Sequence, residues 1–531
     1  MRVLIFHGYL LGGTGSNVYN ARLAEALLRL GHDVHLLCQE RHPEEHSFID
    51  AAGDWDGGEL RVRDLPGGRA ASDRARGRGS CTIYRPDIGG LLPVYVADRY
   101  EGIAARTFAE CTDEEVARYI DANVKAVAEV CGLIRPDVAL ANHLVMGPVI
   151  FARALGGAVP YAVKVHGSAL EYTVKPQPER FLGLAREGLA DAQGVLVGSR
   201  HTALSLWRAI GGEELRERTR LGPPGVDVER FSPREPAAAR AAVRALAEHL
   251  GRSAPVDEGV ADAFARDDRI AARALERIDV EEDRLVAFVG KLIVSKGIDL
   301  LLAAWPLVLD RVPKARLLVI GFGAYREGFE ALAGALAAGD LERAREIARA
   351  GRALEGAPGA SGRPLAHLLA FFDSLGAGER ERYLSLAGGL PERVLLTGRL
   401  DHEELIELLP ACEALVVPST FPEAFGMVAA EAAACGVLPV SAAHSGLAEV
   451  SDALAQAVPP EAARWLSFTV DHDAVRGLAD CVTGWLEAGE EVRSQTRAGL
   501  VATVRERWSW DGVARGVIAA ARGELHGLLP P

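Results

Sequence analysis

Short apolar runs alternate with amphipathic stretches along most of this chain. The apolar run at residues 3–6 is followed by a glycine-rich segment at 11–17 and by apolar residues at helical spacing over 18–30. Gly31 suits the end of that helix, and residues 34–37 read as the next strand. This order of strand, loop, helix and strand predicts a parallel sheet that is covered by helices.

The same alternation returns in two later blocks. Apolar runs lie at 138–141, 161–165 and 195–197 in the first block, and at 285–289, 316–320, 394–396, 415–417 and 437–440 in the second. Gly222-Pro-Pro-Gly225 interrupts the pattern between the two blocks. The chain therefore reads as an α/β protein with two doubly wound domains.

Domain boundaries follow from this pattern. The predicted parts are an N-terminal domain at 1–222, a linker with a helical insertion at 223–283, a C-terminal domain at 284–507, and a final helix at 508–531 that packs back on the first domain. Residues 234–282 and 326–392 are rich in Ala, Leu, Arg and Glu and read as helical insertions. Residues 53–80 are rich in Gly and Arg, which favours a solvated loop over a contact with an anionic acceptor or a phospholipid surface.

Composition narrows the class of protein. Of 531 residues, 49% are hydrophobic and 25% charged, which is typical of a globular protein of two or three domains. The formal charge of −14 opposes non-specific binding to nucleic acid. The seven cysteines show no CxxC spacing, so we expect free thiols and a cytoplasmic location. No apolar run is long enough for a membrane helix, and we interpret the apolar N-terminus as a buried strand and not a signal peptide.

The first candidate site is the glycine-rich loop, which contains Gly13, Thr14, Gly15 and Ser16 between a strand and a helix. Such a loop lets backbone N–H groups approach a phosphate. No lysine follows it as in a Walker A loop, and Val18 stands where a dinucleotide fingerprint has its third glycine. A phosphate site and a tight turn without a ligand are equally good interpretations of this segment.

A second candidate follows the strand at 285–289. This strand ends in Gly290, and Lys291 and Lys296 come directly after it. The chain has six lysines among 59 basic residues, so two of them within six positions stand out. Open α/β sheets bind ligands at the carboxyl ends of their strands, and a compact ammonium group suits a diphosphate. The alternative is a pair of solvated surface lysines.

The third candidate lies between the strand at 415–417 and an alanine-rich helix that we expect to start near Phe425 and to end at Gly436. Glu423 precedes this helix and Glu431 lies on its second turn. A fixed glutamate accepts hydrogen bonds from neighbouring sugar hydroxyls, while the helix start favours a phosphate beside it. Acidic residues on a solvated helix start are the alternative.

Taken together and in this order, the motifs resemble those of the GT-B glycosyltransferases of family 4. The E-x7-E signature of that family matches Glu423 and Glu431, and its strand-end motif matches Gly290-Lys291 and Lys296-Gly297, with lysine in place of the usual arginine. Further matches are Gly225-Val-Asp227, Phe231-Ser-Pro233, Gly398-Arg399-Leu400, His402-Glu-Glu404 and the N-terminal glycine loop. The resemblance implies a GT-B fold, with two Rossmann-like doubly wound domains facing a cleft, helical insertions and a C-terminal crossover helix.

The resemblance also implies roles for single residues of the C-terminal domain. Glu431 would hold the ribose of a nucleotide-sugar donor, Glu423 the donor sugar, and Lys291 and Lys296 the departing diphosphate. The donor-binding set that it implies in this domain is Gly290, Arg399, Leu400, Ala424, Phe425, Gly426, Met427 and Glu431. Within this set, the backbone at 399 and 400 would border the base.

In the N-terminal domain, the resemblance implies that Gly13 to Ser16 close over the phosphate and that His166 is the active-site histidine. With Lys291, Lys296 and Glu423, His166 completes the catalytic residues that we expect. The acceptor candidates are His143, Glu171 and Tyr172, each of which suits a structural polar role equally well. Closure of the cleft is expected to bring this side onto the donor.

The expected activity is that of a retaining hexosyltransferase with a nucleotide-diphosphate sugar as donor, a UDP-sugar first and GDP-mannose next. The acceptor is an unidentified hydroxyl compound. Asp54-Trp-Asp56 and Asp471-His-Asp473 fit the metal motif DxD, but neither follows a strand of the first nucleotide-binding unit, so we expect no metal and no other cofactor. A homodimer and a peripheral membrane contact stay open.

Three alternatives remain beside this interpretation. A nucleotide-sugar epimerase or hydrolase of GT-B fold shares the cleft without an acceptor, although the spacing of Glu423 and Glu431 favours a transferase. A non-catalytic scaffold with a vestigial cleft is opposed by the intact lysines and glutamates. An NAD-dependent dehydrogenase is the weakest, since Glu40 is a poor match to the acidic residue that such a site needs.

Overall fold

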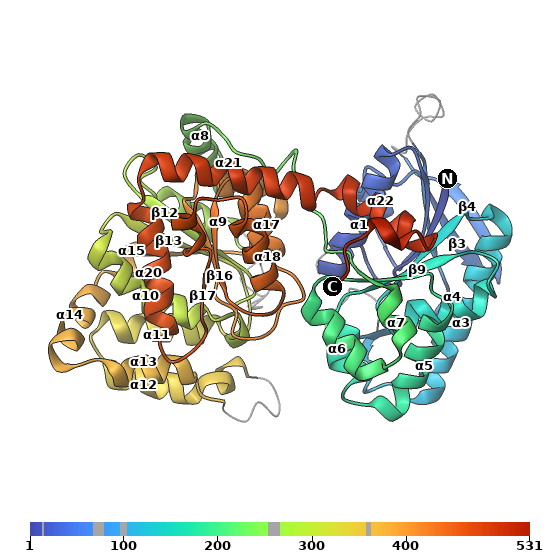
Figure 1. Cartoon of the computed structure of the whole chain (residues 1–531), viewed down its shortest axis with the longest axis horizontal. Coiled ribbons are helices and arrows are strands. Elements are labelled where there is room, and N and C mark those ends of the chain that lie inside the picture. Colours follow the sequence, from blue (N-terminus) through green and yellow to red (C-terminus); the bar gives the residue numbers. More distant parts are fainter. Residues whose placement is uncertain (13–14, 67–78, 96–103, 253–265, 357–362) are drawn as a thin grey trace. The chain divides into compact units, whose positions relative to one another are not determined.

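The computed structural model describes residues 1–12, 15–66, 79–95, 104–252, 266–356 and 363–531 (Figure 1). The chain divides into two compact units. The first consists of Met1–Gly225 and Trp508–Pro531, and the second of Val226–Arg507. Residues 226–283, which the sequence places in a linker, thus belong to the second unit.

The first unit is built on a sheet of strand order β11-β10-β9-β8-β1-β2-β5-β3-β4. The strands are β1 (Arg2–Phe6), β2 (Asp33–Leu37), β3 (Ala51–Asp56), β4 (Glu59–Asp64), β5 (Cys81–Arg85), β8 (Val138–Asn142), β9 (Tyr161–Val165), β10 (Gly194–Val197) and β11 (Thr219–Leu221). Neighbouring strands run parallel except for the antiparallel pair β3 and β4. A small separate pair is formed by β6 (Leu91–Val94) and β7 (Ala104–Thr107).

Helices cover both faces of this sheet, because β1 is apolar on both of its sides. Val3 and Ile5 lie in a core with α1 (Gly15–Arg29) and α22 (Trp510–Ala521). Leu4 and Phe6 lie in the opposite core with α3 (Asp113–Ile134) and α4 (Met146–Leu155). Alternation of side chains along a strand sends successive residues to opposite faces, so a continuous apolar run is what a central parallel strand requires.

The C-terminal helix α22 is part of the first unit, where it packs on α1 (Figure 1). Arg29 pairs with Asp511 at 2.9 Å. Trp510 lies against Gly225, and a Cβ atom at this glycine would come within 2.5 Å of the indole ring. The close approach explains why glycine stands at the end of the Gly-Pro-Pro-Gly segment.

The prediction of a loop over 53–80 is wrong for its first part. Residues 51–64 form the hairpin of β3 and β4, whose turn is Gly57-Gly58 with φ of +59° and +88°. Two glycines at positive φ suit the tight turn of a two-residue hairpin. The strand was missed because β4 is polar and exposed along most of its length. Residues 67–78 lie outside the described residues.

The second unit is built on a parallel sheet of order β14-β13-β12-β15-β16-β17. Its strands are β12 (Arg284–Val289), β13 (Ala315–Ile320), β14 (Val394–Gly398), β15 (Ala414–Val417), β16 (Leu438–Ala442) and β17 (Ser467–Phe468). Helices α8 (Pro236–Gly251) and α9 (Asp268–Glu276) pack on each other, and α9 packs on β14.

The inserted segment between β13 and β14 is helical, as its composition predicts. It contains α11 (Arg326–Ala337), α12 (Leu341–Ala350), α13 (Ala366–Ser374), α14 (Ala377–Ala387) and α15 (Leu390–Arg393). Helices α20 (Ala474–Glu487) and α21 (Glu490–Arg507) complete this unit. Within the described ranges, every helix is too short or too polar to cross a membrane. All seven cysteines are described, and each is a free thiol.

Candidate active site

The lysine-bearing loop leaves the carboxyl end of β12 and enters α10 (Ile298–Arg311). Gly290 donates its N–H to the carbonyl of Ile320, and a 3₁₀ turn, η3 (Val294–Lys296), follows. Gly297 has φ of +68°, and a Cβ atom there would lie 2.0 Å from the carbonyl oxygen of Pro418. Glycine at this position therefore allows the loop to approach the segment that follows β15.

This approach brings together two predicted residues that are 127 positions apart. Lys296 donates a hydrogen bond to Glu423 Oε1, and the two side chains form an ion pair. Ser419 Oγ donates to the same oxygen at 2.7 Å. Lys291 is exposed, and its side chain has no polar partner among the residues that the structure describes. One lysine thus holds Glu423, while the other presents an unpaired charge.

The backbone of Glu423 is fixed by a pair of residues that the sequence did not single out. Its N–H donates to Ser445 Oγ at 2.9 Å, and its carbonyl accepts from Gly446 N at 2.9 Å. His444 Nε2 donates to the carbonyl of Ser419 at 2.8 Å, so its Nδ1 accepts from Ser445 Oγ at 3.0 Å. Ser445 has a φ of +53°, which is strained for a non-glycine residue.

Helix α17 (Met427–Ala434) begins two residues later than its predicted start at Phe425. Ala424, Phe425 and Gly426 lie in the turn before it, and the first helical hydrogen bond runs from Ala430 N to the carbonyl of Gly426. Gly426 is the N-cap, so the N–H groups of the first turn have no helical carbonyl partner. This end of the helix carries a partial positive charge beside Glu423.

Glu431 is only 4% exposed and lies on α17. His402 Nε2 donates to Glu431 Oε1 at 3.0 Å. His402 is the first residue of α16 (His402–Leu408), which follows β14 and the segment of Arg399 and Leu400. The structure thus joins the two motifs that the sequence places at 398–404 and 423–431. The sequence analysis assigned no role to His402.

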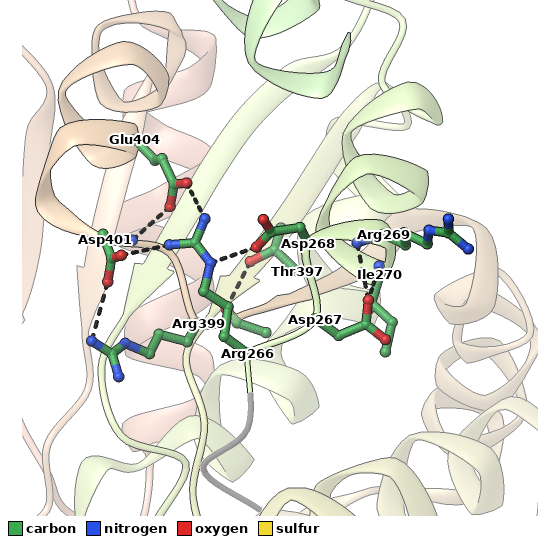
Figure 2. A network of polar contacts seen from close by, with 10 residues as sticks. Arg266, Asp267, Asp268, Arg269, Ile270, Thr397, Arg399, Asp401 and Glu404 are labelled. Carbon is green, nitrogen blue, oxygen red and sulfur yellow. Dashed lines mark hydrogen bonds and ion pairs between the residues drawn. The ribbon is translucent and has the colours of Figure 1, made fainter. Parts of the chain in front are cut away.

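The segment around Arg399 is held by a network of charged side chains (Figure 2). Asp401 and Glu404 form the capping box of α16. Arg266 lies between them and Asp268, with Nη1 2.5 Å from Asp401 Oδ2. Arg399 donates to Asp401 Oδ1 at 3.2 Å, while Leu400 is buried. Several charge-assisted hydrogen bonds from the Arg266 guanidinium hold this turn in place, although part of it is exposed.

In the first unit, His166 belongs to a network of polar side chains. His166 Nε2 donates to Asn142 Oδ1 at 2.8 Å, and Asn142 Nδ2 donates to Asn20 Oδ1 at 2.8 Å. Asn20 Nδ2 then donates to His7 Nδ1 at 3.0 Å, and His7 Nε2 donates to Asn17 Oδ1 at 2.9 Å. This chain of donors sets both tautomers and leaves His166 Nδ1 without a proton.

Burial keeps these imidazoles neutral. It lowers the pKa of His7 to about 4, and it lowers the pKa of His166 well below the usual range, with added repulsion from His143 and Lys164. Lys164 is buried beside them, and burial lowers its pKa to about 7. Its ammonium donates to the carbonyl of Gly222 and lies over the Tyr19 ring at 5.3 Å.

His143 is the most unusual neighbour of this network. It is 1% exposed, has a φ of +69°, and its two ring nitrogens have no hydrogen-bond partner among the described residues. Its ring centroid lies 4.9 Å from that of His166 and 5.8 Å from that of His7. Burial lowers the pKa of His143 well below its usual value, so the ring packs as a neutral aromatic group.

The remaining predicted residues of the first unit lie in two places. Gly15 and Ser16 are the first residues of α1, while Gly13 and Thr14 lie outside the described residues. Glu171 and Tyr172 are part of a π-helical turn, Leu170–Val174. The Glu171 carboxylate is occupied by Lys175 at 2.6 Å and by Ser205 Oγ at 2.5 Å, whereas Tyr172 is exposed.

The acidic residues of the two DxD motifs contact partners within the protein. Asp54 pairs with Arg85, and Asp56 pairs with Arg61. Asp471 accepts a hydrogen bond from the N–H of Asp473 in a local turn. Within the described ranges, no three His, Cys, Asp or Glu side chains are grouped as metal ligands.

Two protein families match the chain. Residues 14–225 match the glycosyl transferase 4-like domain, and residues 370–464 match the glycosyl transferases group 1. Among curated relatives, a D-inositol 3-phosphate glycosyltransferase of Segniliparus rotundus is 29% identical over 50% of this chain and 45% of its own length. One of the same description from Xylanimonas cellulosilytica is 28% identical over 67% of this chain and 63% of its own length. The chain therefore spans about half to three fifths of these relatives.

Solved structures share the fold over nearly the whole chain. Sucrose-phosphate synthase from Thermosynechococcus elongatus matches with a TM-score of 0.52 and 19% identity, covering 99% of both chains. HepE of Anabaena, solved with UDP and glucose, matches with a TM-score of 0.53 and 15% identity, covering 98% of this chain and 99% of its own.

The fold thus defines a protein of the GT-B class. Within that class, the two matched domains place the chain in the glycosyltransferases of family 4, as its motifs predict.

Proposed function

We propose that the chain is a retaining transferase that moves a hexosyl group from a nucleotide-diphosphate sugar to a hydroxyl group of an acceptor. The contact of Lys296 with Glu423, in the loop that leads into α17, is the observation that carries this proposal. It sets a carboxylate for sugar hydroxyls next to cationic groups for a diphosphate. Donors of this kind carry the hydroxyls and the diphosphate on one sugar ring.

The proposed chemistry places charge stabilisation at the leaving group. The bond between the sugar C1 and the β-phosphate oxygen breaks, and the acceptor oxygen bonds to C1 on the same face. The acceptor proton passes to the departing phosphate oxygen. Lys291, Lys296 and the N–H groups before α17 would stabilise the phosphate charge as it develops, which leaves no step that needs a metal ion.

For the donor, we propose that Glu431 accepts hydrogen bonds from the ribose and that the turn at Arg399 and Leu400 borders the base. His402 would keep the Glu431 carboxylate oriented. A UDP-sugar is our first candidate, with GDP-mannose next. The complexes of HepE with UDP and with UDP-glucose support a uridine donor by similarity of fold.

For the acceptor, we propose a hydroxylated small molecule, with polyol phosphates first to be tested. The names of the curated relatives support this order. Among the first-unit residues, the neutral His166 is our candidate for contact with the reacting sugar, since its Nδ1 is available as an acceptor. The free thiols support a cytoplasmic location.

The test is calorimetric titration of the full chain with UDP, GDP, ADP and 3′-deoxy-UDP. We expect one nucleotide to bind selectively, and we expect Glu431→Ala to weaken it by about 10-fold or more, the effect of losing a charge-assisted hydrogen bond. Glu431→Ala should bind 3′-deoxy-UDP with the same affinity as UDP. Chelation with EDTA should leave transfer unchanged.

Exposed Glu346 on α12 provides the control, and Glu346→Ala should bind like the unmodified chain. Failure of all the nucleotides to bind would contradict the proposal. Nucleotide release that proceeds equally with and without acceptors would favour a hydrolase instead.

A further inference from the structure

We propose that Glu355, which belongs to the inserted segment between β13 and β14, positions the loop that carries Lys291 and Lys296. Glu355 is the last residue of a 3₁₀ turn, η4 (Gly351–Glu355), that follows α12. The inference rests on the proposed function, because it assigns the inserted segment a role in holding the donor diphosphate. Glu355 acts through the loop and is a positioning residue.

A direct contact joins the two segments. Val294 N donates a hydrogen bond to Glu355 Oε1 at 2.7 Å. Val294 is the first residue of η3, and Lys296 is the last, so the contact lies two residues before the lysine that pairs with Glu423. The Glu355 side chain is only 10% exposed, which shields the hydrogen bond from water.

The short turn needs this acceptor. Within the loop, Lys296 N and Gly297 N donate to the carbonyls of Ile293 and Val294, and Leu292 N donates to the carbonyl of Phe322. Val294 N is an initial N–H of a three-residue turn, so no carbonyl of the turn itself can accept from it. A partly buried N–H without an acceptor is costly, and a carboxylate is the strongest acceptor that a side chain offers.

The charge of Glu355 is compensated on its other side. Arg352 Nε lies 3.1 Å from Glu355 Oε2. The pair adds little net charge near Lys291 and Lys296, so the carboxylate can support the loop without repelling a diphosphate strongly.

The turn that carries Glu355 is itself well fixed. Gly351 has a φ of +49°, and a Cβ atom there would lie 2.1 Å from the carbonyl oxygen of Arg363. The same carbonyl accepts from Arg352 N at 3.0 Å. Glu355 is therefore held on a turn of defined geometry, which is what a residue that positions another segment requires.

The experiment compares UDP with uridine, because only UDP has the diphosphate. Both are titrated into the unmodified chain and into Glu355→Ala, Glu355→Gln and Glu346→Ala. We expect Glu355→Ala to weaken UDP about 10-fold, as a displaced binding loop does, and to leave uridine unchanged. Glu355→Gln keeps an oxygen acceptor and should stay within about threefold of the unmodified chain.

Amide hydrogen exchange of the peptide over 291–297 gives a second readout that needs no ligand. Exchange should be faster in Glu355→Ala than in Glu346→Ala, which changes an exposed glutamate of the same inserted segment. The inference is wrong if these two variants agree in both UDP affinity and exchange, or if Glu355→Ala weakens uridine as much as UDP. If the unmodified chain binds no nucleotide, the proposed function fails, while the exchange result still decides whether Glu355 supports the loop.

Discussion

Asp299 shows how burial acts on a single ionisable group beside the candidate site. It is 3% exposed in the first turn of α10, and its Oδ1 has no partner among the described residues. Burial raises the pKa of Asp299 from 3.8 to about 7, although the backbone N–H groups of Asp299 and Leu300 act in the opposite direction. The folded chain therefore binds a proton here at pH values where the unfolded chain has already lost it.

From this shift we predict a pH-dependent gain of stability in Asp299→Asn. Between pH 4 and 7 the folded state holds more protons than the unfolded state, so the free energy of unfolding of the unmodified chain falls as the pH rises. Asn carries no charge at any pH. The variant should be more stable by about 1–3 kcal/mol at pH 8, with the difference vanishing near pH 4.

Urea unfolding at pH 4.5, 6 and 8 measures this difference. The control is Asp480→Asn, which removes an exposed carboxyl in the same unit and should show no such trend. A stability gain of equal size at all three pH values would show that the charge of Asp299 is not its cause.

Among the connecting elements, the turn at Gly297 determines how the lysine loop meets the loop after β15. A side chain at φ of +68° is strained, and its Cβ would clash with the Pro418 carbonyl. We expect Gly297→Ala to lower the free energy of unfolding by about 1–3 kcal/mol and to weaken UDP more than uridine. Chemical denaturation and calorimetry measure the two effects.

Gly334 is the matched control for this substitution. It lies within α11, where a Cβ atom meets nothing within 4 Å, so Gly334→Ala should raise stability by about 0.5–1 kcal/mol. If both alanines had the same effect, the close approach of Gly297 to Pro418 would carry no importance.

Elements with a strong apolar pattern were predicted closely. The strand at 161–165 has the predicted bounds, and the strand at 285–289 differs by one residue. Helix α1 starts at Gly15, three residues before the predicted start, because Gly15, Ser16 and Asn17 lack the apolar spacing that marks a helix. The β3–β4 hairpin has one polar strand, so the pattern of hydrophobic residues did not reveal it.

At the scale of the whole molecule, Trp510 tests the division into two units. Its indole is buried in the first unit, 5.5 Å from the Tyr19 ring and against Gly225. Loss of a large buried side chain costs about 3–5 kcal/mol, so Trp510→Ala should destabilise this unit strongly. Hydrogen exchange should become faster in peptides of β1 and α1 and stay unchanged in those of β12 and α10.

Trp485→Ala is the complementary variant, since Trp485 is fully buried in α20 of the second unit. In Trp485→Ala, exchange should become faster in peptides of β12 and α10 and stay unchanged in those of β1 and α1. Equal acceleration in both sets of peptides by either variant would mean that the chain unfolds as one cooperative body.

The sequence by itself determined the fold class and the main candidates of the site. Apolar periodicity predicts parallel sheets, and the scarcity of lysine draws attention to Lys291 and Lys296. Motif order then connects these lysines with Glu423 and Glu431. These features are local along the chain, and a local pattern reports the environment of each residue and the type of element it forms.

Only the tertiary structure decided which side chains meet. The pairing of Glu431 with His402, the support of Glu423 by Ser445 and the contact of Glu355 with Val294 join segments that are distant in sequence. Such contacts depend on the order of strands in the sheet and on close approaches at glycines such as Gly297. The hydrophobic pattern reveals neither of these features, because it would be the same for a different order of strands in the sheet.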